Sequence, residues 1–529
     1  MSEEITPAQL KAALGDGQEL ALVDAREQGV YFHGHLLFAA CIPLSHLEMR
    51  VADSIPRQAT RIVLCDAGGE DLAHRAARKL SRFGYSDVRV LAGGVAAWKA
   101  AGYEVFSGIN VVSKAFGEYV EHRHGTAHIS AEDLARKVAG GEDLVILDSR
   151  PLEEYRNLSI PGGVDCPGAE LVHRVFDAAP NPNTLVVVNC AGRTRSIIGA
   201  QSLINAGIPN KVMALKNGTM GWELAGFQVA RGQTAHAPTP APAGIAKASS
   251  AAARVKSRFG VRAIHMEQLL QLEREPRTLY VLDVRTAAEY EAGHLPGSRH
   301  APGGQLVQAT DEYAVTRHAR IVLVDDTGVR AIMTASWLLQ MGWKEVYVLE
   351  DDLSQTLEYG AAKANFLDFA VTPSIPADAL KAALDSGGGA AILDLGTSLQ
   401  YRKQHIPGAY WGIRSRLTEV LANLESPREL FITSPDGVLA HYAARDIAAL
   451  KPEISVRVLE GGTRAWTGAG YPVASGPEKF ACEPNDIWYK PYEQAGGVRK
   501  AMEDYLAWEV NLMPQIERDG DAKFYSPFQ

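Results

Sequence analysis

The feature that most constrains this fold is a short phrase that the chain repeats four times. Each copy is an apolar, mostly β-branched run that ends in an aspartate, and the copies read LALVDAR (20–26), LVILDSR (144–150), LYVLDVR (279–285) and AAILDLG (390–396). Successive copies lie a domain length apart, whereas the repeats of a solenoid recur about every 20–50 residues. The chain is therefore expected to contain four tandem domains of one design.

Further shared segments follow the aspartate in a constant order. Three copies continue with EEYRNLSIPGG (153–163), AEYEAGHLPGS (288–298) and LQYRKQHIPGA (399–409). A second apolar run, an Ala- and Leu-rich stretch and a third apolar run come next, and three copies then reach a glycine turn followed by Trp98, Trp222 or Trp466. Short strands that alternate with amphipathic helices predict an α/β fold, each module being a parallel sheet with helices on both faces.

The repeats also define the expected boundaries. The four modules are predicted at 4–107, 128–230, 258–362 and 374–475. Residues 231–257 are rich in alanine, proline and serine and contain little to bury, so we expect a linker there. Residues 476–529 match no copy but are too aromatic for a disordered tail. Their apolar spacing from Val498 predicts a helix that ends near Pro514 and packs on a module or, in a homodimer, on a second subunit.

Composition narrows the class of protein. The net charge of −9 argues against nucleic acid as the main partner. No apolar run approaches the roughly 18–20 residues that a membrane span needs, and the N-terminus MSEEITPAQL lacks the apolar core of a signal peptide. The five cysteines form no CxxC pair and show no metal-ligand spacing. We therefore expect a cytoplasmic protein with reduced cysteines, no membrane partner, no metal and no cofactor.

One cysteine stands in unusual surroundings. In VVVNCAGRTRS (186–196), Cys190 ends a β-branched run, and a short loop leads from it into a helical stretch. A thiol becomes a good nucleophile only as a thiolate. Three features would favour the thiolate. They are the N-terminus of the helix that follows, the loop N–H groups turned inward as an anion nest, and the charges of Arg193 and Arg195. Gly192 gives such a loop its backbone freedom. The alternative is that Cys190 is a small buried hydrophobic residue.

Together these segments resemble the rhodanese family of sulfurtransferases. The resemblance rests on Asp-x-Arg after a strand, the His-Ile-Pro-Gly-Ala phrase, a strand that leads into a cysteine before a helix, and Leu-x-Gly-Gly-x-x-x-Trp, and it covers 4–475 apart from the linker. It implies five-stranded parallel sheets with the chemistry in the loop after the cysteine-bearing strand, in agreement with the general rule for open α/β sheets. It also implies that sulfane sulfur moves from thiosulfate, or a related donor, to cyanide or a thiol through a persulfide on Cys190.

The resemblance assigns roles to the residues around this cysteine. Cys190 is the expected nucleophile, and the donor and persulfide would be held by Ala191, Gly192, Arg193, Thr194, Arg195 and Ser196. Asp148 and Arg150 would lie at the mouth of the same site, either in contact with substrate or as an ion pair that only ties down the strand end. The partners implied are a small anionic sulfur donor and a thiol or cyanide acceptor.

The other modules lack this constellation. Aligned by the following helix, the position of Cys190 is held by Asp66, Asp325 and a residue near Ser434, so we expect those three modules to be inactive. Cys65 precedes Asp66 by one position, so we expect it to be a strand residue that faces the core; the alternative is an active cysteine offset by one position. Cys166 could resolve a persulfide as a disulfide, or it could be a buried spectator.

Two other functions stay open at this point. One is a multi-module scaffold or a redox or sulfur sensor that binds proteins. The other is a cysteine phosphatase or arsenate reductase, although the C-x4-R loop is one residue shorter than the C-x5-R loop of cysteine phosphatases and so favours sulfur over a phosphoryl group.

Overall fold

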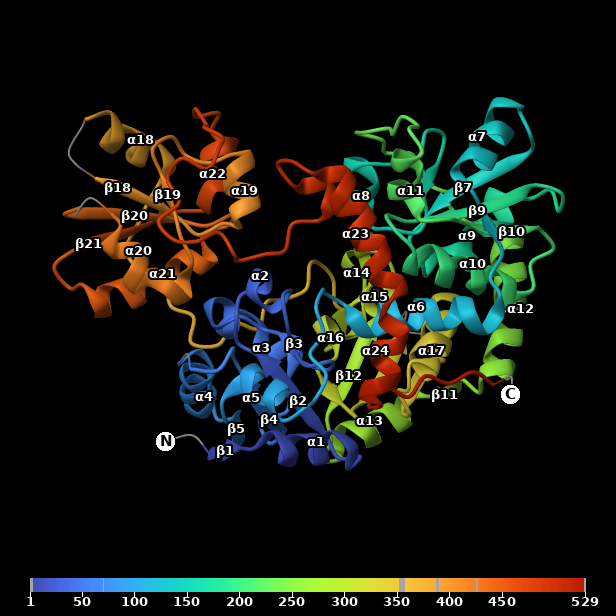
Figure 1. The fold of residues 1–529 in the computed structure, drawn as a ribbon, viewed down its shortest axis with the longest axis horizontal. Coiled ribbons are helices and arrows are strands. Elements are labelled where there is room, and N and C mark those ends of the chain that lie inside the picture. The colour runs from blue at the N-terminus through green and yellow to red at the C-terminus, as the bar shows by residue number, and fades with distance from the viewer. Residues whose placement is uncertain (1–2, 70, 352–356, 387–389, 425–426, 528–529) are drawn as a thin grey trace.

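Four parallel sheets, one from each repeat, form the framework of the molecule (Figure 1). The computed structural model describes residues 3–69, 71–351, 357–386, 390–424 and 427–527. All four sheets share one strand order, with the aspartate-bearing strand between a short edge strand and the strand that leads into the loop of interest. The prediction of four α/β modules is confirmed.

The strands of each module lie side by side in the following order across its sheet. Module one has β1 (Glu3–Ile5), β5 (Asp87–Leu91), β4 (Arg61–Cys65), β2 (Leu20–Asp24) and β3 (Ala40–Cys41). Module two has β6 (His128–Ile129), β10 (Val212–Leu215), β9 (Leu185–Asn189), β7 (Leu144–Asp148) and β8 (Val164–Asp165). Module three has β11 (Arg262–Ile264), β16 (Val346–Leu349), β15 (Arg320–Val324), β12 (Leu279–Asp283) and β13 (Arg299–His300). Module four has β17 (Ser374–Ile375), β21 (Ser455–Leu459), β20 (Glu429–Thr433), β18 (Ala391–Asp394) and β19 (Tyr410–Trp411).

Helices connect these strands in each module. Module one contains α1 (Pro7–Gly15), α2 (Gln28–Tyr31), α3 (Leu47–Ser54), α4 (Leu72–Arg82) and α5 (Gly94–Ala100). Module two contains α7 (Ala131–Ala139), α8 (Leu152–Asn157), α9 (Glu170–Ala178), α10 (Thr194–Ala206) and α11 (Gly218–Leu224). Module three contains α13 (Met266–Arg274), α14 (Ala287–Ala292), α15 (Gly303–Gln308), α16 (Thr310–Tyr313) and α17 (Val329–Gln340). Module four contains α18 (Ala377–Asp385), α19 (Ser398–Lys403), α20 (Leu417–Ala422), α21 (Val438–Leu450) and α22 (Gly462–Gly468).

The central strands are apolar throughout because both faces of each sheet are covered. In β9, Val186 and Val188 pack into a core shared with α9 and α10, whereas Val187 between them packs with residues of α7 and α11. Side chains of a strand alternate between its two faces, so burial on both faces requires a continuous apolar run. This is the physical reason for the β-branched phrases in the sequence.

The segment expected to be a linker with little to bury is instead structured over much of its length. Helix α12 (Pro242–Phe259) packs against α9 of module two and α17 of module three. Ala248, Ala251, Ala252 and Val255 on this helix are fully buried. Each small side chain buries little area, but together they let α12 approach α9 and α17 closely. The composition of the segment did not indicate this packing.

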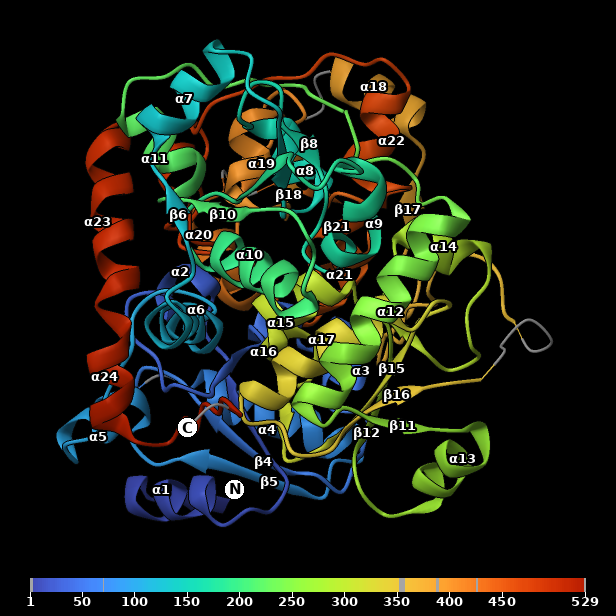
Figure 2. The same ribbon diagram turned by 90° about the vertical axis from the view of Figure 1, so that its right-hand side faces the viewer.

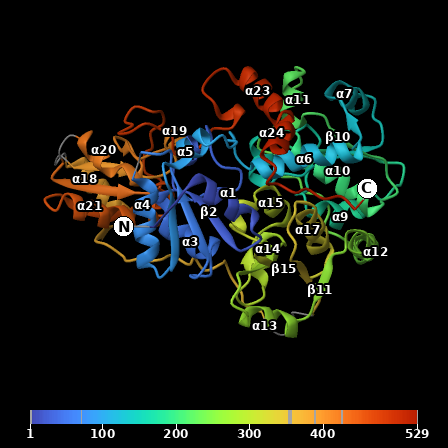
Figure 3. The same ribbon diagram turned by 60° about the horizontal axis from the view of Figure 1, so that its bottom comes forward.

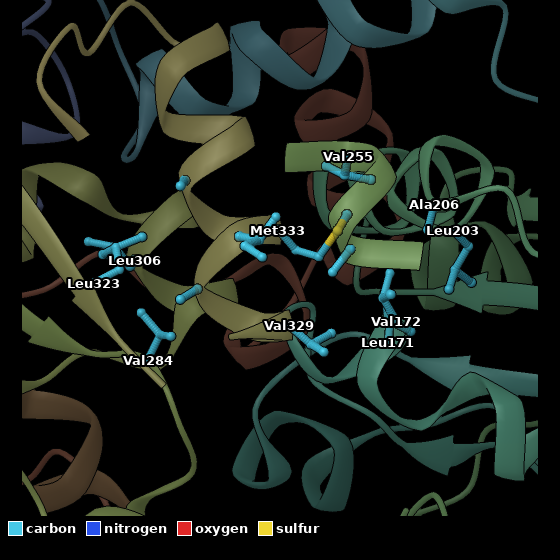
Figure 4. Close-up of a cluster of buried hydrophobic side chains, with 14 of the residues drawn as sticks. Leu171, Val172, Leu203, Ala206, Val255, Val284, Leu306, Leu323, Val329 and Met333 are labelled. Carbon is cyan, nitrogen blue, oxygen red and sulfur yellow. The ribbon is translucent and has the colours of Figure 1, made fainter. Parts of the chain in front are cut away.

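Modules two and three consequently share one hydrophobic core. Figure 4 shows Leu171 and Val172 of module two, Val255 of α12 and Met333 of module three in the same cluster. Module three also touches module one through its strand β14 (Thr316–Arg317), which pairs antiparallel with β2 and extends the first sheet.

Two segments outside the modules lie beside module two. Helix α6 (Val111–His124) follows module one and packs against α10, and it is crossed by the C-terminal helices α23 (Val498–Val510) and α24 (Leu512–Asp519) (Figures 2 and 3). The expected helix end near Pro514 is wrong. The helix ends earlier, and Pro514 lies in the first turn of a second helix, where a residue without an N–H donor loses no hydrogen bond. The tail packs on the modules of its own chain.

Candidate active site

Cys190 is the first residue after β9, at the carboxyl end of a central strand of module two. The equivalent residues after β4, β15 and β20 are Asp66, Asp325 and Ser434. The registers agree, because Asp148 pairs with Asn189 in module two just as Asp24 pairs with Cys65 in module one. Cys65 is therefore the last residue of its strand, fully buried in the module-one core, as predicted.

The same loop holds a carboxylate in two of the modules that lack the cysteine. In module one, the Asp66 carboxylate accepts hydrogen bonds at 3.0 Å from the backbone N–H groups of Gly68 and Ala73. In module three, Asp325 accepts one at 2.8 Å from the N–H of Arg330. These loops thus form nests of backbone donors around a negative charge. In module two a thiol occupies the place of that carboxylate.

A turn that contains Gly218 packs against the Cys190 loop. The carbonyl of Cys190 accepts hydrogen bonds from the Thr219 N–H at 2.8 Å and the Thr219 hydroxyl at 3.1 Å. A Cβ at Gly218, whose φ is +57°, would lie 2.4 Å from that carbonyl oxygen. The turn therefore requires a glycine for both its φ and its close approach, which explains the recurring glycine before the repeated tryptophan.

The thiol itself is buried, with only 2% of Cys190 exposed. Burial raises the pKa of Cys190 above its ordinary value, while the Arg195 charge and a hydrogen bond with Ser196 act to lower it. The Sγ–Ser196 Oγ distance is 3.5 Å. The loop sequence predicts a depressed pKa, but it does not include the desolvation that comes with burial, and in the structure the direction is upward.

The two loop arginines have different surroundings. Arg193 turns away from the thiol and pairs with Glu118 of α6 at 2.7 Å and with Glu121. Arg195 pairs with Glu154 of α8 at 2.8 Å, and its charge is the largest influence that lowers the pKa of Cys190. The loop sequence predicts free positive charge at both arginines, but both are matched by carboxylates distant in sequence.

Asp148 and Arg150 form a buried ion pair of 2.7 Å, and Arg150 also donates to the carbonyl of Leu158. Modules one and three, which have no cysteine at the loop position, contain the same arrangement, namely Arg26 with Asp24 and the carbonyl of Gly34, and Arg285 with Asp283 and the carbonyl of Gly293. A pair that recurs without the cysteine is what a structural role predicts, so the geometry favours an ion pair that ties down the strand end over contact with substrate.

Cys166 lies in the core shared by modules two and three, where burial raises its pKa well above the ordinary value. Every one of the five cysteines is free. The described residues contain no group of side chains that could hold a metal ion, and no described helix is long and apolar enough to cross a membrane.

Residues of the C-terminal tail complete the surroundings of Cys190, and the motif analysis missed them. Ala191 packs in an apolar cluster with Met220, Met502 and Leu506, the last two from α23. A Cβ at Gly192 would lie 2.9 Å from Glu509 Oε2 and 3.3 Å from the Tyr505 ring. The aromatic character of the tail was visible in the sequence, but no repeat indicated which module it would cover.

A groove with a volume of about 720 Å³ opens beside the C-terminal tail. It lies between module one and the tail, and its lining includes Phe32, Trp488, Tyr489, Tyr505 and Trp508. Tyr505 contacts the groove and also approaches Gly192 of the cysteine loop.

Comparison with known proteins covers nearly the whole chain. The Rhodanese-like domain family matches residues 6–101, 130–225 and 265–358, and the fourth sheet, outside these ranges, has the same strand order. The crystal structure of a thiosulfate sulfurtransferase from Pseudomonas aeruginosa is 46% identical, covers 99% of both chains and superposes with a TM-score of 0.94.

Two curated relatives match parts of the chain. The putative sulfur carrier protein YrkF of Bacillus subtilis (strain 168) is 32% identical over 24% of this chain and 71% of its own length. The HTH-type transcriptional regulator Rv0324 of Mycobacterium tuberculosis (strain ATCC 25618 / H37Rv) is 32% identical over 19% of this chain, which spans 43% of that regulator.

Proposed function

Because this chain belongs to the rhodanese-like domain family and is homologous over its full length to a thiosulfate sulfurtransferase, we propose that it transfers sulfane sulfur through a persulfide on Cys190. Thiosulfate, or another small anionic sulfur donor, loads the cysteine, and cyanide or a thiol removes the sulfur. The reaction is a double displacement in which one thiol is used twice. The reduced cysteines are consistent with a cytoplasmic location.

The observation that carries this proposal is the replacement of a nest-bound carboxylate by a thiol. The same loop binds the carboxylates of Asp66 and Asp325 in modules one and three. A loop that accommodates a carboxylate is suited to a thiolate or a persulfide anion. The first amides of α10, at Thr194 and Arg195, have no acceptor within the helix and are available to such an anion.

The individual roles follow from position. Cys190 is the nucleophile, and the loop from Ala191 to Ser196 supplies the anion nest. Arg195 stabilises negative charge on the sulfur, whereas Arg193 fixes the loop to α6. Asp148 and Arg150 hold the end of β7. Modules one, three and four are non-catalytic, since a carboxylate or a hydroxyl cannot form a persulfide.

Mass spectrometry after treatment with thiosulfate tests this proposal. We expect one added sulfur atom, about 32 Da, mapped to Cys190. Cys190→Ser should abolish both the adduct and thiocyanate formation, whereas Cys65→Ser, a change in the buried core of module one, should leave both intact. A wild-type protein that acquires no persulfide, or that hydrolyses a phosphate ester through Cys190 instead, would exclude sulfur transfer.

A further inference from the structure

A buried carboxyl from outside the four modules lies beside the cysteine loop. Glu509 is on α23 and only 2% exposed. Its Oε1 accepts hydrogen bonds from the hydroxyls of Thr194 at 3.3 Å and Tyr505 at 3.2 Å. Its Oε2 is buried and finds no hydrogen-bond partner among the described residues. Because both hydroxyls donate to Oε1, the neutral form of this carboxyl carries its proton on Oε2.

The unpartnered oxygen faces the loop. Glu509 Oε2 lies 2.9 Å from the position that a Cβ of residue 192 would occupy, so this oxygen packs directly against the loop. An unpaired buried oxygen costs stability, and such an oxygen in a functional loop calls for an explanation. The Glu509 charge also acts on the Cys190 thiol, whose pKa it raises.

The charges around Glu509 allow it to gain and lose a proton. Burial raises its pKa, Glu118 of α6 raises it further, and Lys114 of α6, Arg193 and the Tyr505 hydroxyl act to lower it. The Lys114 ammonium is itself buried against aromatic rings, with Nζ 4.7 Å from the ring centres of Tyr505 and Trp508 and 5.7 Å from that of Trp488. A neutral carboxyl is thus favoured by burial, and its anion by a nearby cation.

We propose that Glu509 is the proton-transfer group that lets the Cys190 persulfide pass its sulfur to a thiol. This inference rests on the proposed function and extends it by naming the acceptor class for which the site is equipped. Lys114 is a positioning residue that stabilises the Glu509 carboxylate. The groove lined by Tyr505 is the side from which a small thiol reaches the loop.

The cycle balances with one proton. The Cys190 thiolate attacks the outer sulfur of thiosulfate, a new S–S bond forms, and sulfite leaves with the electron pair of the broken S–S bond. Glu509 gives its Oε2 proton to the sulfite, which departs as hydrogen sulfite. The Glu509 carboxylate then takes the proton of the acceptor thiol. The thiol sulfur attacks the outer sulfur of the persulfide, the acceptor leaves as a persulfide anion, and Cys190 recovers its thiolate. At a pH above the pKa of hydrogen cyanide, cyanide arrives as an anion and needs no such proton transfer.

The difference between the two acceptors defines the experiment. Persulfide-loaded enzyme, prepared with thiosulfate and freed of excess donor, is discharged in a single turnover with an alkanethiol or with cyanide. Both reactions run at a pH above the pKa of hydrogen cyanide and below that of the thiol, so that cyanide is the anion and the thiol keeps its proton. Glu509→Gln keeps Oε1 as an acceptor but removes the exchangeable proton. We expect the thiol rate to fall about 100-fold, the lower range for general acid–base catalysis, and the cyanide rate to stay within about twofold. Glu503→Gln, an exposed change on the same helix, serves as the matched control.

Each outcome has one meaning. A selective loss of thiol discharge supports the inference, whereas unchanged rates, or equal losses with both acceptors, overturn it. Absence of the persulfide in the wild-type protein would instead defeat the proposed function itself. If Glu509→Gln does not fold, Tyr505→Phe decides, because it removes one hydrogen bond to Oε1 and keeps the ring. A lower ratio of thiol to cyanide discharge then supports the inference, and an unchanged ratio overturns it.

Discussion

Arg330 joins modules two and three, and its replacement should loosen both. The guanidinium is fully buried and pairs with Asp325 at 2.9 Å, Glu170 of module two at 2.9 Å, Glu289 at 2.8 Å and Asp326 at 2.7 Å. Removing one partner of a buried ion pair costs about 3–5 kcal/mol, because the other charge stays buried. In Arg330→Met, Asp325 and Glu170 are the buried charges that lose this partner.

The expected cost lies at the lower end of that range. Asp325 keeps the backbone N–H of residue 330, and Glu170 keeps Arg174 at 2.6 Å. A loss of about 3 kcal/mol corresponds to about 6–12 °C in Tm for a unit of the size of two joined modules. Arg174→Met, which removes a partly exposed partner of the same Glu170, is the control and should cost about 1 kcal/mol or less.

The pH dependence separates lost charge from lost packing. Burial raises the pKa of Glu170, but its cationic neighbours outweigh burial and hold the pKa below its ordinary value of 4.5. A carboxyl with a depressed pKa stabilises the fold above that ordinary value and loses this contribution as the pH falls through the folded-state pKa. The Tm difference between wild type and Arg330→Met, measured by scanning calorimetry, should therefore narrow below pH 4.5. A constant difference down to acid pH would refute the electrostatic account.

Three further changes test the site and its supports. Arg195→Ala should raise the pKa of the Cys190 thiol, whereas Arg193→Ala should leave it nearly unchanged, and iodoacetamide alkylation against pH would report both; equal shifts would contradict the distinct surroundings of the two arginines. Gly108→Ala would place a Cβ 2.1 Å from the Trp508 ring, displace the tail and speed alkylation of Cys190, while Gly69→Ala, also at positive φ but with open space around it, should not. The truncated chain 1–246 cuts α12 within the shared core and should be insoluble or aggregated by light scattering; a soluble, fully active monomer would show that the second half contributes nothing to the chemistry.

The repeats predicted the part of the structure that local patterns determine. Counting from the following helix identified Asp66 and Asp325 as the counterparts of Cys190, because strand, loop and helix keep their spacing from module to module. The β-branched run before Cys190 and the glycine in its loop are likewise local signals of a buried strand and a tight loop.

Contacts between distant segments could not be predicted in this way. Glu118, which neutralises Arg193, belongs to a helix that no motif links to Cys190. Glu154, which neutralises Arg195, lies in one of the repeated segments, but nothing in that segment indicates that it faces the cysteine loop. Glu509 lies in the tail, with two whole modules between it and the cysteine that it approaches. The direction of the Cys190 pKa was missed for a related reason, since the burial that raises it depends on the whole fold around the loop and not on the loop sequence.

The packing of α12 determines where the chain can be divided into exchangeable domains. The sequence contains four repeats, but the hydrophobic core that includes Leu171, Val255 and Met333 is continuous through two of them. A recombination joint placed after module two would divide that core and leave apolar surface on both halves. Modules two and three therefore form one structural unit, and gene fusions or domain grafts should carry the two together.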